Sequence, residues 1–426
     1  MLIEFKVTNF RSIKETQTLS MVAGNATKDK ELASNTFDSG IPKLGNLLKS
    51  AVIYGPNAAG KSNLIAALAF MENMVRTSAT DAQVGKKIKV NPFRLEAVSR
   101  NEDTEFEIHF IAEKVRYQYG FTLNTQRITS EWLLAYPYGS PQRWFHRQYN
   151  RVTEKYDYEF KPSFTEGRAR VERSNYTIAN NLYLSVAVQK NSQQLIPVFN
   201  WFQNNLNYLT SMSHVSSSDT SNLSQNPEEK QKVLAFMNDA GINIKGFLVE
   251  KKRVTLDDLR EDIPEELKQK ILEEITKNPV FDTKFLYQSN DDESLIAFDL
   301  DDESDGTRVL FAFAAWWIDL LKNNDILFVD EIDTSLHPLL VHHLVKMLHV
   351  SKSKAQLIFT THDTTLLSQR IMRSDQVWFV EKDKLQSTQL YSLSDYSPRP
   401  NEAIEPGYLN GRYGAIPFLS DIDFYG

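Results

Sequence analysis

The chain has 426 residues, which is more than one average domain needs and is typical of a protein with two or three lobes. Its 48 basic and 55 acidic residues give a net charge of −7, which argues against a uniformly basic protein that coats nucleic acid but leaves a local basic groove open. The absence of cysteine excludes disulfides, zinc ribbons, iron–sulfur clusters and thiol nucleophiles. The first residues lack the apolar core of a signal peptide, and the apolar run at 309–321 is interrupted by Asp319, so we expect a cytoplasmic protein without a membrane partner.

The N-terminal segment predicts a strand, a loop, a second strand and a helix. Residues 2–10 alternate apolar and polar side chains, as in a half-exposed strand, and the polar residues 25–43 predict a loop. The apolar residues 50–54 predict a buried strand that stops before a Gly-Pro pair. Apolar side chains at helical spacing then predict a helix over 62–75.

The middle of the chain changes from strand-rich to helix-rich. Short runs of Val, Ile, Phe, Tyr and Thr over 88–160 predict antiparallel strands and hairpins. Residues 197–277 are expected to be mostly helical, and the Ser-rich stretch 211–224 predicts a flexible link. The helices expected in this part lie at 199–206, 227–240 and 264–277.

The C-terminal part predicts a parallel sheet. An acidic run at 291–305 precedes a helix at 307–322. Two apolar strands, 326–329 and 356–359, follow with a helix between them, which is the pattern of parallel neighbours.

A glycine-rich motif follows the strand at 50–54. Gly-Pro-Asn-Ala-Ala-Gly-Lys-Ser at 55–62 matches the phosphate loop GxxxxGK[ST] in the required strand-to-helix context, which disfavours the alternative of a chance glycine-rich turn. Glycines let backbone N–H groups surround phosphate oxygens at the positive end of the helix. Lys61 would bridge the β- and γ-phosphates, and the Ser62 hydroxyl would bind Mg²⁺. The predicted nucleotide-binding residues are Asn57, Ala58, Ala59, Gly60, Lys61, Ser62 and Asn63.

Acidic and histidine side chains follow the two C-terminal strands. Asp330 would bind the metal, and Glu331 would be the general base that polarises an attacking water. Acidic strand ends are common, so this prediction depends on the phosphate loop. His362 follows the next strand and would sense the γ-phosphate. A lone histidine is usually structural, and its strand–helix–strand spacing from Glu331 favours the functional role.

A second anion site is predicted where the helix at 307–322 begins. Ser304 and Gly306 would present a hydroxyl and bare amides at a helix N-terminus. The alternative is a simple helix cap.

The order of phosphate loop, long insertion, Ser-x-Gly helix, Asp-Glu strand and histidine resembles ATP-binding-cassette ATPases of the SMC and RecF-like group. Asn9-Phe10-Arg11-Ser12 looks like the opening strand of that group. Glu-Ile-Asp-Thr-Ser-Leu-His-Pro at 331–338 and Tyr-Leu-Asn-Gly-Arg-Tyr-Gly-Ala-Ile-Pro at 408–417 are similar to the stand-alone AAA-family ATPases of bacterial defence operons. The RloA and AbiL types resemble the chain most, and PtuA and AriA are more distant. The similarity covers residues 1–190 and 290–420.

This resemblance implies an α/β fold of the ATP-binding-cassette head type. A mixed sheet with flanking helices and an antiparallel β lobe would be formed by residues 1–190 and 291–426. Residues 191–290 would be a mainly helical insertion.

The resemblance also implies additional roles for single residues. Ser304, Asp305 and Gly306 would be the signature that completes the ATP site of a second subunit, and Asp333 would lie on the loop that crosses the interface. Arg11 would approach the nucleotide. Gln189 would contact the metal, although a strand-ending Gln is more often simply polar surface.

The implied function is Mg²⁺-dependent ATP hydrolysis in a homodimer or larger assembly that senses infection and controls a separate nuclease or toxin in an anti-phage system. One alternative is a RecF-like DNA-repair ATPase, which would need a basic surface. Another is a nuclease in its own right, for which the only motif is Asp421-Ile422-Asp423 near the end of the chain. The basic and aromatic residues at 143–151 fit a nucleic-acid platform but are more typical of a hairpin with a charged face.

Overall fold

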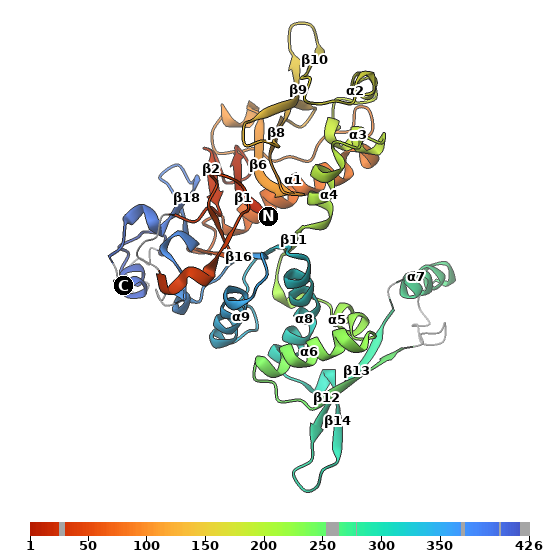
Figure 1. The fold of residues 1–426 in the computed structure, drawn as a ribbon, viewed down its shortest axis with the longest axis vertical. Coiled ribbons are helices and arrows are strands. Elements are labelled where there is room, and N and C mark those ends of the chain that lie inside the picture. The colour runs from red at the N-terminus through yellow and green to blue at the C-terminus, as the bar shows by residue number, and fades with distance from the viewer. Residues whose placement is uncertain (25–29, 253–263, 278, 368–370, 400–401, 418–426) are drawn as a thin grey trace, which may run out of the picture. The chain divides into compact units, whose positions relative to one another are not determined.

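The computed structural model describes residues 1–24, 30–252, 264–277, 279–367, 371–399 and 402–417. The chain forms two compact units, each built from separate segments. Unit 1 comprises Met1–Thr210, Asn323–Glu331 and Val345–Gly426, and unit 2 comprises Ser211–Lys322 and Ile332–Leu344. Figure 1 shows the elements of both units, coloured from red at the N-terminus to blue at the C-terminus.

The central sheet of unit 1 has six strands. In spatial order they are β11 (Leu206–Leu209), β15 (Ile326–Val329), β16 (Gln356–Thr360), β5 (Ser50–Tyr54), β17 (Val377–Lys382) and β18 (Thr388–Ser392). The first five are parallel, and β18 is antiparallel to β17. Every residue of β5, β15 and β16 is buried, as expected for apolar strands covered on both faces. The predicted parallel sheet is therefore confirmed.

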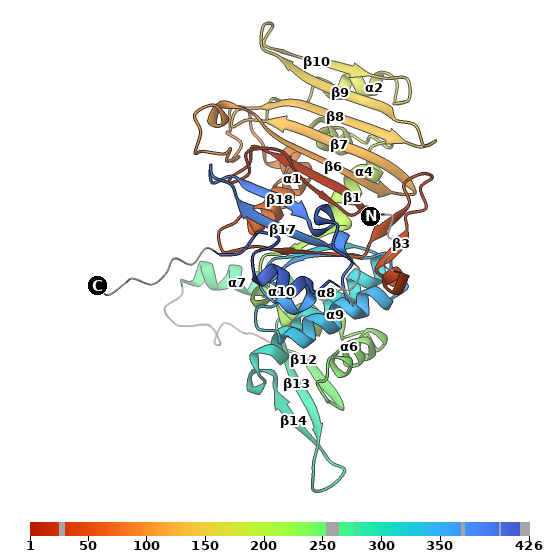
Figure 2. The ribbon, with the colours of Figure 1, turned by 90° about the vertical axis from the view of Figure 1, so that its left-hand side faces the viewer.

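The second large sheet of unit 1 is antiparallel throughout. It comprises β10 (Lys155–Phe160), β9 (Gln142–Asn150), β8 (Ile128–Tyr136), β7 (Val115–Leu123), β6 (Thr104–Ala112), β1 (Leu2–Thr8) and β2 (Gln17–Ser20), in that spatial order. Figure 2 shows these strands side by side, with helices behind them. The predicted β lobe is confirmed, and the segment 143–151 lies largely in β9, which pairs with β10 as a hairpin. A small pair, β3 (Thr36–Asp38) and β4 (Asn46–Leu48), completes the described strands of this unit.

Helices of unit 1 cover the lobe from one side. These are α1 (Lys61–Asp81), α2 (Arg168–Ser174), α3 (Tyr183–Gln189) and α4 (Ile196–Asn204). Apolar residues of α1 and α4 share one core with β1, β6 and β7, and the rings of Phe110 and Trp201 stack with centroids 4.1 Å apart. This core fixes α1, and with it the phosphate loop, relative to both large sheets.

Unit 2 contains helices and an additional sheet that the sequence did not predict. The helices are α5 (Ser217–Leu223), α6 (Pro227–Asp239), α7 (Glu265–Lys277) and α8 (Asp305–Asn323). The antiparallel sheet has the order β12 (Gly246–Lys251), β13 (Phe281–Gln288) and β14 (Leu295–Asp299). The prediction of a flexible link at 211–224 is wrong, because Ser216 caps α5 and the buried Thr220 donates to the Ala312 carbonyl of α8 at 3.0 Å.

The other helices are α9 (Pro338–Val350) and α10 (Ile404–Leu409). Short 3₁₀ turns are η1 (Lys30–Asn35), η2 (Ser99–Asn101), η3 (Met212–His214), η5 (Leu300–Asp302), η6 (Thr364–Leu367), η7 (Ser374–Gln376) and η8 (Leu393–Tyr396). No helix within the described ranges is long and apolar enough to cross a bilayer.

Candidate functional site

The phosphate loop connects β5 to α1 in a tight curl. Ala58 (φ +63°) and Gly60 (φ +116°) have left-handed backbones, which turn successive N–H groups toward one side of the loop. Lys61 is buried, and its Nζ donates to the Gly55 carbonyl at 2.8 Å. The same Nζ lies 3.5 Å from Nε2 of His362. The structure therefore brings the predicted phosphate-binding lysine and the predicted sensor histidine together.

A chain of hydrogen bonds supports the loop from distant segments. Asn63 Nδ2 donates to Ser12 Oγ at 2.7 Å, which in turn lies 2.7 Å from Thr388 Oγ1. Thr388 Oγ1 donates to the Ala59 carbonyl at 2.8 Å. A Cβ added at Gly60 would lie 2.2 Å from Thr388 Oγ1, so this close approach requires glycine. Thr388 was missed in the sequence analysis because one threonine that is 329 residues from Ala59 has no local signature.

Arg11 lies beside the first turn of α1. Its Nη1 donates to Asn63 Oδ1 at 3.3 Å, and its backbone N–H donates to the Asn91 carbonyl at 2.7 Å. Arg11 has φ +50°, so the turn after β1 holds it in a conformation that is uncommon for a non-glycine residue. The structure thus places Arg11 next to the predicted nucleotide-binding residues.

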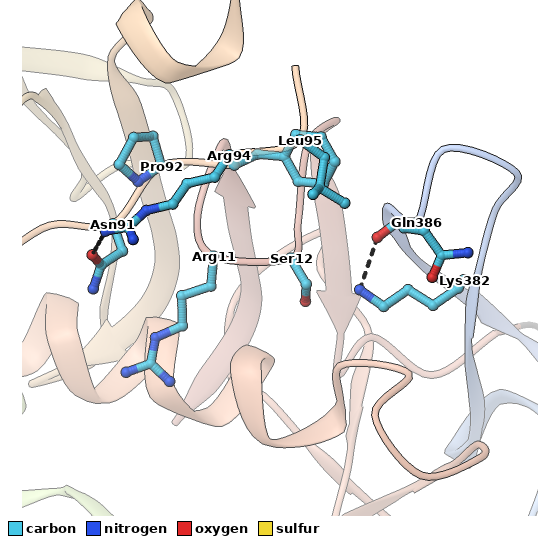
Figure 3. A pocket seen from close by; sticks show the side chains of 9 residues that line it. Arg11, Ser12, Asn91, Pro92, Arg94, Leu95, Lys382 and Gln386 are labelled. Atoms are coloured by element: carbon cyan, nitrogen blue, oxygen red, sulfur yellow. Dashed lines mark hydrogen bonds between the residues drawn. The ribbon is translucent and has the colours of Figure 1, made fainter. Parts of the chain in front are cut away.

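A pocket of about 590 Å³ opens beside Arg11 (Figure 3). The turn after β1, the segment that follows α1, and the β17–β18 hairpin line it. Its cationic side chains are Arg11, Arg94 and Lys382, and no acidic residue is among the described residues that line it. Arg94 donates to Asn91 Oδ1 at 2.6 Å, and Lys382 donates to the Gln386 carbonyl at 2.9 Å. Burial lowers the pKa of Lys382. The lining favours a ligand that carries negative charge or a planar ring on which an arginine can stack.

Asp330 and Glu331 follow β15 and are both held by Thr360. Thr360 ends β16 and is completely buried. Its Oγ1 donates to Asp330 Oδ1 at 2.6 Å and accepts the backbone N–H of Glu331 at 2.7 Å. Glu331 has φ +51°, a conformation that costs energy in a non-glycine residue and recurs at functional sites. Its side chain is exposed at the edge of the sheet.

The parallel register brings these groups to one edge of the six-stranded sheet. β16 lies between β15 and β5, with Thr360 paired to Ile53 of β5. The phosphate loop and Asp330 therefore follow strands that are two spacings apart, about 10 Å. A phosphate group together with a bound cation is large enough to join positions at this separation.

Gln189, the predicted metal-binding glutamine, lies away from this edge. It ends helix α3, so the expectation of a strand there is wrong. Leu182 N–H donates to Ser78 Oγ, and Ser185 Oγ donates to the Val75 carbonyl, which sets α3 antiparallel to α1. Extending this alignment places Gln189 roughly 13 Å along α1 from Ser62. Burial of residues 183–187 against α1 outweighed the strand preference of their valine and tyrosine side chains.

Thr210 instead lies at the edge next to Asp330. Leu209 of β11 pairs with Val329 of β15, and the Asp330 N–H donates to the Leu209 carbonyl at 2.9 Å. Thr210 follows directly and is exposed. It was missed because no strand was predicted at 206–209.

The residues of the predicted signature lie in unit 2, at the start of α8. Ser304 Oγ accepts the Thr307 N–H at 3.2 Å, as a helix-capping side chain does. Asp305 forms an ion pair with Arg308. A Cβ at Gly306 would lie 3.1 Å from the Ser335 carbonyl, so the helix start and the loop after Asp333 are in close contact.

The C-terminal segment with the Tyr-Leu-Asn-Gly-Arg-Tyr-Gly pattern packs within unit 1, against the central sheet. Thr364, in the turn after His362, donates to Glu405 Oε1 at 2.7 Å. The N–H of Ala415 donates to Glu381 Oε2 of β17 at 2.8 Å. This segment therefore contacts both the central sheet and the turn that carries the histidine.

The remaining features are one predicted motif and the arrangement of potential metal-binding side chains. Asp421-Ile422-Asp423 lies beyond the residues that the structure describes. Within the described ranges, no group of three or more His, Asp or Glu side chains is arranged to bind a metal ion.

The residues at the edge nevertheless fit a nucleotide accompanied by Mg²⁺. Ser62 is exposed at the start of α1, next to the buried Lys61, and offers a hydroxyl oxygen. Asp330 is oriented by Thr360 and offers a carboxylate. Mg²⁺ prefers such oxygen ligands and usually combines one or two protein ligands with phosphate oxygens and water.

The comparison with protein families agrees with a nucleotide site. A family profile described as "AAA domain, putative AbiEii toxin, Type IV TA system" matches residues 50–368, which include the phosphate loop, Asp330 and His362. A search of curated proteins found no match. The SMC head domain from Thermotoga maritima is similar at 12% identity and a TM-score of 0.41, over 92% of this chain and 98% of that one. An SMC head bound to the C-winged helix domain of ScpA is similar at 12% identity and a TM-score of 0.40, over 92% of this chain and 97% of that one.

Proposed function

The chain belongs to this AAA-domain family, and on that premise we propose that it is a Mg²⁺-dependent ATPase whose ATP-driven assembly controls a separate effector protein. The observation that carries the catalytic part is that the segments after β5, β15 and β16 meet at one edge of the six-stranded sheet. Lys61 and His362 are 3.5 Å apart, and Thr360 orients both Asp330 and Glu331.

Each of these residues has one role in the proposed reaction. Lys61 and the loop amides bind the β- and γ-phosphates, and Ser62 and Asp330 hold Mg²⁺, which neutralises charge on the phosphate oxygens when it is bound. Glu331 takes a proton from water as the water oxygen bonds to the γ-phosphorus and the bond to the bridging oxygen breaks, releasing ADP. His362 orients the γ-phosphate, and the pocket beside Arg11 receives the nucleoside.

The second part of the proposal is that two copies share each nucleotide. Ser304 and Gly306 would contact the γ-phosphate bound to the partner subunit, and Asp333 would lie at the interface. The ion pair of Asp305 with Arg308 supports this role, because it offsets a carboxylate that would otherwise repel phosphate. Contact of Gly306 with the Ser335 carbonyl supports joint movement of the helix start and the interface loop.

The third part concerns biological context. The family description names a toxin of a type IV toxin–antitoxin system, which supports a role in anti-phage defence. We assign the toxic or nucleolytic step to a separate effector that the ATP-bound assembly holds or releases. Phage plating on cells that carry the chain with its genomic neighbours tests this assignment, since Lys61→Ala should abolish protection if ATP binding is the switch.

The decisive biochemical test is the solution mass of wild type and Glu331→Gln, each with and without Mg·ATP. The variant should gain the mass of at least one further copy with ATP, while wild type should do so only transiently. Lys61→Ala, which cannot bind the phosphates, is the control and should not respond. A large mass that is independent of ATP in all three proteins would contradict the shared site and would leave an ATP switch inside a preformed assembly.

A further inference from the structure

The strand β14 is an apolar edge strand in unit 2. Among the strands that the structure describes, β13 is its single neighbour, and all five residues of β14 are exposed. Leu295, Ile296 and Phe298 are 53%, 47% and 42% exposed. The β13–β14 hairpin reaches past the end of β12, which pairs only as far as Leu286 (Figure 1). Edge strands of soluble proteins are usually blunted by proline, a bulge or a central charge, and β14 has none of these before its last residue.

The backbone of β14 presents hydrogen-bonding groups on its open side. The Leu286 carbonyl accepts the Lys245 N–H at 2.8 Å, so the backbone of Leu286 faces β12 and not β14. Its antiparallel partner in β14 is Ala297. In an antiparallel pair of this kind, Ala297 turns its N–H and C=O away from β13. By alternation, Leu295 and Asp299 do the same.

Acidic residues surround this edge. Residues 290–305 contain eight Asp or Glu residues and no Lys, Arg or His, so this segment has a net charge of −8. The net charge of the whole chain is −7. Those that flank β14 are Asp291, Asp292 and Glu293 on one side and Asp299, Asp301 and Asp302 on the other. All six are exposed; among the residues that the structure describes, Asp299 pairs with Lys284 at 2.9 Å and Asp301 lies 3.9 Å from Arg308.

The acidic flanks of β14 favour a basic partner strand over a second copy of this chain. If two copies paired through β14, the acidic flanks would lie opposite each other in either strand direction, and like charges that face each other across strands are destabilising. A strand with basic ends would instead complement both flanks and approach faster at low salt.

We propose that the β14 edge binds an extended segment of a partner protein that has a β-branched centre and Lys or Arg at both ends. The segment adds to the sheet as a fourth strand, through the backbone groups of Leu295, Ala297 and Asp299. This site belongs to unit 2, whereas the phosphate loop belongs to unit 1, and the proposed binding needs no ATP hydrolysis.

The test uses the full chain and two labelled peptides. Each has a Val-Thr-Val-Thr-Val centre, flanked by Lys-Lys in one and by Glu-Glu in the other. Wild type should bind the lysine peptide and not the glutamate peptide in a fluorescence anisotropy titration without nucleotide. Ala297→Pro removes an N–H that β13 does not use and should weaken binding by about tenfold or more, whereas Ala297→Val keeps that N–H and should bind within about twofold of wild type.

Several outcomes would overturn the proposal. These are equal binding of the two peptides, no binding of the lysine peptide, or unchanged binding by Ala297→Pro. Unchanged thermal unfolding and ATP hydrolysis of Ala297→Pro exclude misfolding as the cause of a loss. If the chain instead forms a concentration-dependent dimer that Ala297→Pro abolishes, then the strand that binds β14 is a second copy of this chain and not a basic partner.

Discussion

The Thr360 hydroxyl lies 2.6 Å from Asp330 Oδ1 and donates its proton to that oxygen. Thr360 Oγ1 also accepts the N–H of Glu331 at 2.7 Å, so one buried side chain sets both the carboxylate that would hold the metal and the backbone that carries the proposed base. A hydroxyl has only one proton to donate, and here it is committed to Asp330. Loss of this hydroxyl should therefore disturb two catalytic groups at once.

Thr360→Val should lower kcat for ATP by roughly tenfold to a hundredfold, with a smaller change in KM. The valine has nearly the same shape but leaves the Glu331 N–H and Asp330 without their partner, at a stability cost of about 1–3 kcal/mol. Thr360→Ser keeps the hydroxyl and should retain most activity. Steady-state kinetics with urea unfolding of both variants separate the two effects, and equal activity of the two would rule out the hydroxyl's role.

Gly60→Ala should abolish nucleotide binding, because the alanine meets Thr388 and must also adopt φ +116°. The double variant Gly60→Ala with Thr388→Ala removes the contact but not the backbone strain, so it should stay inactive. Gly139→Ala is the matched control, since Gly139 has φ +81° with no atom near its added Cβ. Binding of a fluorescent ATP analogue distinguishes these variants, and recovery in the double variant would assign the defect to the clash alone.

Glu131→Gln should destabilise the β lobe by about 3–5 kcal/mol, because it leaves the cation of Arg147 buried without its counter-charge. Both side chains are 0% exposed, with Arg147 Nη1 3.7 Å from Glu131 Oε2. The Glu131 carboxylate also accepts the N–H groups of Tyr183 and Leu184 at the start of α3. Glu159→Gln is the control, since its pair with Arg143 is about half exposed and should contribute at most about 1 kcal/mol. Similar urea midpoints for the two variants would contradict this account.

Stability should fall as the pH decreases below about 6.5, in part through His349. Burial, assisted by the charge of Lys49, lowers the pKa of His349 to about 3. His349 of the unfolded chain binds a proton near pH 6.5, whereas His349 of the folded chain binds one only near pH 3. The contribution of neutral His349 to the free energy of unfolding is therefore complete above pH 6.5 and is lost as the pH falls from 6.5 to about 3. The loss has a limiting slope of about 1.4 kcal/mol per pH unit.

His349→Gln removes this titration and should flatten the profile of urea-unfolding free energy from pH 7 to pH 4.5. The glutamine amide can still bond to Ser50 Oγ, which lies 2.8 Å from His349 Nε2. His214→Gln is the control, because His214 is exposed and should leave the slope unchanged. If the unfolding free energies of wild type and His349→Gln depend on pH in the same way, then groups other than His349 cause the acid sensitivity.

Much of the fold could be predicted because the responsible patterns are local. The apolar runs at 50–54, 326–329 and 356–359 became the buried parallel strands, and the alternating segments became the antiparallel sheet. The glycine-rich motif at 55–62 lies between a strand and a helix, as predicted. The predictions for residues 183–189 and 211–224 are wrong, since burial against α1 and α8 outweighed their local preferences.

The sequence by itself determined where the phosphate loop, the acidic strand end and the histidine lie along the chain, because each depends on neighbouring residues that shape a turn or a strand. Only the tertiary structure decided which side chains hold them, as Thr388 holds the Ala59 carbonyl and Thr360 holds Asp330. It also decided that Gln189 lies away from the edge that Thr210 occupies. The physical reason is that a hydroxyl or an amide is satisfied by whichever partner the packed core brings within 3 Å, and that partner can be hundreds of residues away.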